Sequence, residues 1–155
     1  MQKSLILEKN KIIFVIASLN DLNVINKIEK ELKFNLTTLK QFNFLFDNQV
    51  SYLWKILYKN EIIGFIQLKG DKIESEILSI GVKKNFQGLG VGKKTIKFLI
   101  KKGFKNIFLE VSEKNTKAIN FYYSVGFKKI EIRKKYYKIN KIKPENAQIL
   151  NLTII

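Results

Sequence analysis

The sequence predicts an α/β domain with about seven strands and four helices in the order β-α-α-β-β-β-α-β-α-β-β. Two observations predict this fold class. Apolar residues switch repeatedly between the three- and four-residue spacing of helices and the short apolar runs of buried strands. A strand, a glycine-rich loop and a helix also follow one another directly in residues 77–102. With 155 residues, 46% of them apolar, the chain is expected to form one domain over 1–155.

The first half of the chain predicts one strand, two helices and then three strands. Residues 12–18 are apolar and β-branched, which favours a buried strand. Asn20 or Asp21 is expected to cap a helix with apolar positions 22, 25, 28 and 32, and a second short helix is expected at about 37–46. The three strands are predicted at 52–58, 62–68 and 74–82, with turns between them.

The second half alternates helices and strands. Apolar residues 91, 95, 96, 99 and 100 share one face of a helix that Gly103 is expected to end. A strand at 106–111 and a helix at about 116–125 follow, and two strands near 127–132 and 148–153 complete the chain. The sequence contains neither an internal repeat nor a linker.

Composition limits the chemistry. The chain has no Cys and no His, so we expect no metal site, and acid–base chemistry must use Glu, Asp, Tyr, Lys or water.

The net charge is +16, but Arg133 is the only arginine, which argues against a sequence-specific nucleic-acid reader. AT-rich coding bias or diffuse attraction to RNA would each explain the lysines. No segment is long enough to span a membrane and the apolar run 12–17 is short for a signal peptide, so we expect a cytoplasmic protein.

The glycine-rich loop predicts an anion site. It reads Gln87-Gly88-Leu89-Gly90-Val91-Gly92 and opens a helix whose first turn carries Lys93 and Lys94. Free N–H groups at a helix start and two lysines suit a phosphate, although lysine is common throughout this chain. The spacing of the glycines fits neither a P-loop nor a dinucleotide fingerprint.

The loop does match the pattern Q/R-x-x-G-x-G/A, as Gln87-x-x-Gly90-x-Gly92, and here it resembles the acetyl-coenzyme A loop of the GNAT acetyltransferases. The element order is similar to that of this superfamily along the whole chain, which implies a mixed, mostly antiparallel sheet. The segments 109–111, 115, 118–127 and 133–137 resemble the bacterial ribosomal-protein alanine N-acetyltransferases of the RimI type.

The resemblance implies acetyl-coenzyme A as the cosubstrate and assigns its contacts. Backbone groups of Ile80, Gly81 and Val82 would bind the pantetheine arm. The loop would hold the pyrophosphate, through Gln87, Gly88, Leu89, Gly90, Val91, Gly92 and Lys93. Asn115 would contact the coenzyme in the family, but it also precedes a helix and could serve only as its N-cap.

Two residues carry the expected chemistry. Glu110 is the candidate base, because it is a carboxylate in the apolar strand 107–111, where burial raises the pKa of a carboxyl group. The alternative is a glutamate in solvent or paired with lysine. Tyr122 is the candidate acid, since a phenol is protonated at neutral pH and can donate to sulfur. It could instead be a core residue, with Tyr123 as the functional tyrosine.

The resemblance implies that the acceptor enters between residues 34–39 and the loop expected at 134–145, where Tyr136 and Tyr137 lie. Relatives often have Glu-Asp-Ala where this chain has Glu145-Asn146-Ala147. The expected activity is transfer of acetyl to a protein N-terminus, with a ribosomal protein as the candidate acceptor. The alternatives are a GNAT enzyme for a small amine or lysine side chain, and a non-catalytic module that binds acetyl-coenzyme A or RNA.

Overall fold

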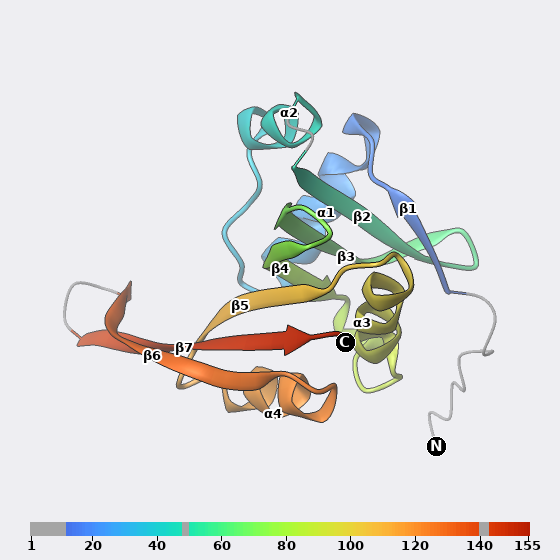
Figure 1. The fold of residues 1–155 in the computed structure, drawn as a ribbon. Helices are drawn as coiled ribbons and strands as arrows, with labels where there is room; N and C mark the ends of the chain where they lie inside the picture. Colours follow the sequence, from blue (N-terminus) through green and yellow to red (C-terminus); the bar gives the residue numbers. More distant parts are fainter. Residues whose placement is uncertain (1–11, 48–49, 140–142) are drawn as a thin grey trace, which may run out of the picture.

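The computed structural model describes residues 12–47, 50–139 and 143–155, without the side chains of 135–144. Seven strands form one sheet, flanked by four α-helices and two short 3-10 helices (Figure 1). The strands are β1 (Ile12–Ile16), β2 (Ser51–Tyr58), β3 (Glu61–Gly70), β4 (Glu74–Val82), β5 (Asn106–Ser112), β6 (Lys128–Ile139) and β7 (Lys143–Thr153). The helices are α1 (Leu22–Glu31), α2 (Leu39–Asp47), α3 (Val91–Lys101) and α4 (Thr116–Ser124). The predicted element order is confirmed.

The sheet is mixed and mostly antiparallel, as expected. Its strand order is β1-β2-β3-β4-β5-β7-β6, and the β4–β5 pair alone is parallel. Helix α3 makes the crossover between these two parallel strands, which a direct hairpin could not connect.

Helices cover both faces of the sheet. Ile96 and Leu99 of α3 pack with Tyr122 of α4 against Leu109 and other strand residues in the larger core cluster. Residues of α1 and α2 pack on the opposite face, around Phe65. Figure 1 shows α2 and α4 on opposite sides of the sheet. Strands with alternating inward and outward residues therefore contribute to two separate cores.

Helix α3 forms as its sequence predicts. Val91, Thr95, Ile96 and Leu99 are buried on one face. Gly103 adopts φ +90°, and its N–H donates to the Ile100 carbonyl while the Phe104 N–H donates to that of Leu99. This left-handed glycine ends the helix where the sequence indicates.

The predicted cap of α1 is right in its position and wrong in its hydrogen bond. Asp21 stands at the N-cap position of α1, but its carboxylate makes no capping bond to that helix. It accepts instead from the Ser18 N–H at 2.7 Å and the Lys55 Nζ at 2.9 Å. A buried carboxylate with a lysine available on β2 satisfies more of its lone pairs in this way than at a helix end.

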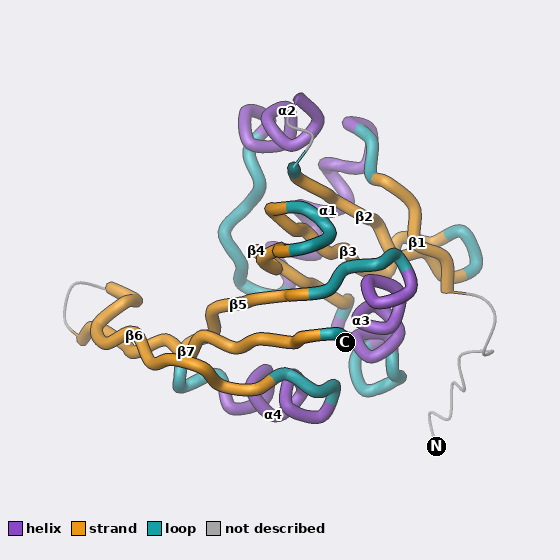
Figure 2. The backbone as a smooth tube through the Cα atoms, viewed as in Figure 1, coloured by secondary structure: helices purple, strands orange, loops and turns teal. Residues whose placement is uncertain are grey.

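The last two strands are longer than predicted. Strands β6 and β7 extend through much of the segment 134–145, which was expected to be a connecting loop. Figures 1 and 2 show them as a ribbon that projects beyond the end of β5. The sequence of this part is rich in lysine and lacks the apolar alternation by which strands are predicted. Tyr136 and Tyr137 lie in β6, and their side chains lie outside the described residues.

Candidate functional site

The pairing of β4 with β5 ends abruptly. Their parallel register runs from Glu74 with Asn106 to Ile77 with Leu109 and goes no further. Beyond it, Ile80, Gly81 and Val82 remain paired to β3, while Glu110 and Val111 remain paired to β7. The edges of β4 and β5 that face each other in this stretch therefore have backbone groups without a strand partner.

The loop after β4 has the backbone of an anion cradle. Gly88 and Gly90 have φ +75° and +81°, a region that other residues adopt only with strain. A Cβ added at either glycine would meet no atom within 4 Å, so the space above them is open. The first intrahelical bond of α3 runs from the Lys94 N–H to the Gly90 carbonyl, which leaves the earlier N–H groups for a ligand. The loop thus fits a phosphate group.

Gln87 is engaged within the protein. Its Nε2 donates to the Val82 carbonyl at 2.9 Å, and its Oε1 accepts from Lys117 Nζ at 2.9 Å. Its backbone N–H donates to the Lys84 carbonyl. Gln87 therefore ties the end of β4 to the start of α4 and fixes the loop. It also bonds the carbonyl of Val82, one of the residues whose backbone groups were expected to bind the coenzyme.

Gly92 has a packing role that the pattern of glycines alone does not indicate. A Cβ at this position would lie 2.8 Å from Cζ of Phe121 in α4. The absence of a side chain thus lets α3 and α4 approach closely next to the loop.

Glu110 lies on β5 beside the opening between β4 and β5. Its side chain is 16% exposed, and its Oε1 accepts from Nη1 of Arg133 at 2.5 Å. The structure thus pairs Glu110 with the arginine of β6 and not with a lysine.

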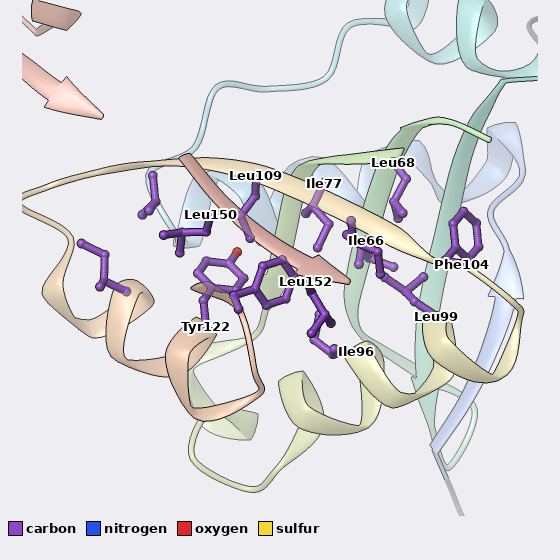
Figure 3. Packing of buried hydrophobic residues seen from close by; sticks show 14 of the residues in the cluster. Ile66, Leu68, Ile77, Ile96, Leu99, Phe104, Leu109, Tyr122, Leu150 and Leu152 are labelled. Carbon is purple, nitrogen blue, oxygen red and sulfur yellow. The ribbon is translucent and has the colours of Figure 1, made fainter. Parts of the chain in front are cut away.

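Tyr122 is both a core residue and a candidate acid. Only 7% exposed, it packs with Phe127 and other apolar residues, and Figure 3 shows its hydroxyl directed toward the sheet. Burial raises the pKa of the phenol well above its usual value of 10.0, so the group keeps its proton at every physiological pH. Tyr123, by contrast, is exposed and donates to Oε1 of Gln148 at 2.9 Å.

Asn115 caps α4. Its Oδ1 accepts from the Ala118 N–H at 3.1 Å, which is the structural role considered for it. The amide nitrogen of the same side chain can still donate to a ligand.

The segment expected on the acceptor side joins α1 to α2. Glu29 anchors it by accepting from both the N–H and the hydroxyl of Thr37, at 2.8 and 2.6 Å. Phe34, Leu36 and Leu39 are 40, 50 and 54% exposed, so this segment presents apolar side chains to solvent. At the other expected boundary, Glu145 accepts from Ser112 and Lys114.

No helix in the described residues is long and apolar enough to cross a membrane. Likewise, no group of three or more acidic side chains in the described residues is arranged to hold a metal ion.

Comparison with known proteins decides the family. The model of the acetyltransferase (GNAT) family matches residues 17–127, which include the loop, Glu110 and Tyr122. The chain belongs to the GNAT family of acetyltransferases. It is therefore an N-acetyltransferase, and members of this family take the acetyl group from acetyl-coenzyme A.

Three similar proteins are informative. The chain is 33% identical to N-alpha-acetyltransferase 50 of Danio rerio over 116 residues, 68% of each chain. It is 35% identical to the [ribosomal protein bS18]-alanine N-acetyltransferase of Haemophilus influenzae over 100 residues, 62% of this chain and 68% of that one. Among solved structures, the ribosomal-protein-S18-alanine N-acetyltransferase from Escherichia coli matches with a TM-score of 0.78 and 24% identity, covering 92% of this chain and 94% of that one. The GNAT fold and the resemblance to RimI-type enzymes are confirmed.

Sequence reasoning missed several residues at this site. Arg133 was noted as the single arginine and as part of the segment 133–137, but it received no role at the site, and neither did Lys117 or Glu76. Pairing across three strands brings Arg133 to Glu110, and no local pattern reveals such a contact. Glu76 could have been found, because the period of two in a strand places it on the face opposite Ile77.

Proposed function

We propose that this GNAT enzyme acetylates the N-terminal α-amine of a protein, with a ribosomal protein that begins with alanine as the acceptor. One observation carries the proposal: Glu110 lies just beyond the last pair between β4 and β5, and Tyr122 packs in the same core as the two residues of that pair, Ile77 and Leu109. Relatives named for α-amine and ribosomal alanine acetylation support the choice of acceptor. We also infer that the enzyme works in the cytoplasm, where such an acceptor is made.

The donor would lie along the free edge of β4 and end on the loop. Backbone groups of Ile80 and Gly81 would bind the pantetheine arm, with Val82 contributing to the extent that Gln87 leaves it free. The residues Gly88 to Lys93 would hold the pyrophosphate at the start of α3. The amide nitrogen of Asn115 would add one donor.

The chemistry needs two proton transfers. Glu110 would accept a proton from the acceptor nitrogen, through a water molecule, as the nitrogen attacks the thioester carbon. When the carbon–sulfur bond breaks, the hydroxyl of Tyr122 would donate its proton to the sulfur. Burial keeps this hydroxyl protonated until that moment because it raises the pKa of the phenol. Carboxylate and phenol thus serve as base and acid without histidine.

Mass spectrometry of a synthetic peptide that starts with alanine tests the proposal. The peptide is incubated with the enzyme and acetyl-coenzyme A, next to the same peptide with a blocked N-terminus and free internal lysines. We expect one acetyl group on the free peptide and none on the blocked one. Acetylation of the lysines, or of spermidine but neither peptide, would overturn the α-amine assignment while leaving the family intact.

A further inference from the structure

A buried glutamate of α1 holds the α1–α2 segment, residues 33–38. Glu29 lies in the last turn of α1 and is only 2% exposed. Its Oε2 accepts from the backbone N–H of Thr37 at 2.8 Å, and its Oε1 accepts from the hydroxyl of Thr37 at 2.6 Å. In the orientation that satisfies both ends of its amide, Asn26 donates to the same Oε2 at 2.8 Å and to the Thr37 carbonyl at 3.1 Å. Both oxygens of the buried carboxylate therefore have partners.

The backbone of Glu29 holds the other end of the segment. Its carbonyl accepts from the Phe34 N–H at 2.8 Å, and the Lys33 N–H donates to the Lys30 carbonyl at 3.2 Å. Lys33 has φ 59°, so α1 ends in a Schellman motif with a lysine at the left-handed position that glycine usually occupies. Glu29 thus fixes the segment twice, by its carbonyl near the start and by its carboxylate near the end.

These bonds hold a segment that buries very little of itself. Thr37 is its one half-buried residue, and the other five are exposed. Phe34 and Leu36 are 40 and 50% exposed, so the segment offers apolar side chains to solvent. A segment with so few core contacts would open easily, and the bonds to Glu29 keep it in one conformation. A fixed backbone with exposed apolar side chains is suited to binding an extended ligand.

The α1–α2 segment begins beside the opening between β4 and β5. A Cβ added to Gly81 would lie 3.1 Å from Cδ1 of Leu32, the residue directly before the segment. Gly81 belongs to the part of β4 that has separated from β5, because the last pair between these strands is Ile77 with Leu109. The chain therefore leaves α1 next to the edge of β4 along which the donor would lie.

We propose that Glu29 is a positioning residue for the acceptor, which holds the α1–α2 segment so that Phe34 and Leu36 bind the acceptor peptide beyond its amine. This inference rests on the proposed function, because it requires a peptide acceptor at this opening. Glu29 is buried and acts through the segment, without contact with the reacting groups. When its bonds to Thr37 are lost, only the fraction of molecules with the segment in place can bind the acceptor, and the apparent affinity falls by that fraction.

Steady-state kinetics with the alanine peptide test this role. Thr37→Val removes the hydroxyl donor and keeps the branched shape of the side chain, and Glu29→Gln replaces one carboxylate oxygen by a donor. We expect each variant to raise KM for the peptide by about 10-fold or more, as when the segment is in place in about a tenth of the molecules. Both kcat and the Kd of acetyl-coenzyme A, measured by calorimetric titration, should stay within about twofold of the wild type. Thr37→Ser keeps the hydroxyl and should recover most of the lost affinity.

Asp21→Asn is the matched control for the loss of a buried carboxylate. Asp21 lies at the opposite end of α1, where it is bonded to Ser18 and Lys55. Asp21→Asn should lower the melting temperature and leave KM for the peptide unchanged. If the wild type acetylates the peptide, an unchanged KM in Thr37→Val, or an equal rise in Asp21→Asn, would overturn this inference alone. Thr37→Val leaves the buried carboxylate in place, so it decides the question if Glu29→Gln does not fold.

The same assay separates this inference from the proposed function. If the wild type acetylates spermidine and not the peptide, the proposed acceptor is wrong. The KM of Thr37→Val for spermidine then decides the role of Glu29, because a rise supports positioning of that acceptor and an unchanged value overturns it. A wild type that acetylates no amine overturns both proposals.

Discussion

Arg133 reaches across β7 to pair with Glu110, with Nη1 and Oε1 2.5 Å apart. The arginine lies on β6 and the glutamate on β5, and β7 separates the two strands in the sheet. Ile149 of β7, the register partner of Glu110, lines a pocket together with both residues. The pairing thus brings the charge of a peripheral strand to the proposed base.

Replacing either the candidate acid or the candidate base should slow catalysis. Tyr122→Phe and Glu110→Gln should each lower kcat by about 10²- to 10⁴-fold. Because the Tyr122 hydroxyl has no hydrogen-bond partner among the described residues, Tyr122→Phe should leave the melting temperature unchanged. Tyr123→Phe is the control, since that tyrosine is exposed and bonded to Gln148. Inactivity of Tyr123→Phe together with activity of Tyr122→Phe would reverse the assignment.

Two glycines of the loop should respond differently to alanine. Gly92→Ala places a Cβ against the ring of Phe121 and should cost about 1–3 kcal/mol of unfolding free energy. Gly90→Ala places a Cβ in open space, where it should cost about 1–2 kcal/mol through its left-handed backbone and should also weaken binding of acetyl-coenzyme A. Denaturation and calorimetric titration separate the two effects. Equal binding of the coenzyme by Gly90→Ala and the wild type would argue against the cradle.

Asp21 should make the free energy of unfolding depend on pH in the acidic range. Burial opposes its ionisation, but hydrogen bonds from Ser18 and Lys55 and the lysine charge together lower its pKa below 3.8. The stabilisation is therefore present above that value and lost as the pH falls through the lowered pKa. Asp21→Asn should cost about 2–3 kcal/mol at neutral pH and progressively less in acid, as urea denaturation would measure. Asp71→Asn, in an exposed turn, should cost less, and an equal cost would contradict the role of the buried pair.

Glu76 should make the stability of the protein depend on pH in the opposite direction. Its pKa in the folded protein is raised above the ordinary 4.5, so the folded state loses stability as the pH rises from 4.5 through the raised value. Glu76→Gln removes this loss and should melt higher than the wild type at neutral pH, with a smaller difference in acid. A lower melting temperature at neutral pH would contradict this dependence and assign Glu76 a structural role.

The elements with strong local signals could be predicted from the sequence. Helix α3 lies where its apolar spacing, the loop before it and Gly103 after it place it. The motif at Gln87 to Gly92 led to the family, which the comparison then established. The identity of the two candidate catalytic residues remains a prediction, supported by their positions near the opening.

Contacts between distant residues could not be predicted. The bonds from Asp21 to Lys55 and from Glu110 to Arg133 link residues on different strands, and Gln87 meets Lys117 only because α3 and α4 lie side by side. The extra length of β6 and β7 is seen in their mutual pairing, and the lysine-rich sequence there has no hydrophobic periodicity that would predict it.

The separation of β4 and β5 also has a thermodynamic consequence. Only four residue pairs join the strands β1 to β4 to the strands β5 to β7, whereas β5 and β7 share seven. A donor bound along this seam would act as a removable cross-link between the two halves of the sheet. At a hundred times its Kd it would add about 2.7 kcal/mol to the free energy of unfolding. The resistance of the enzyme to heat would then rise and fall with the supply of its own substrate.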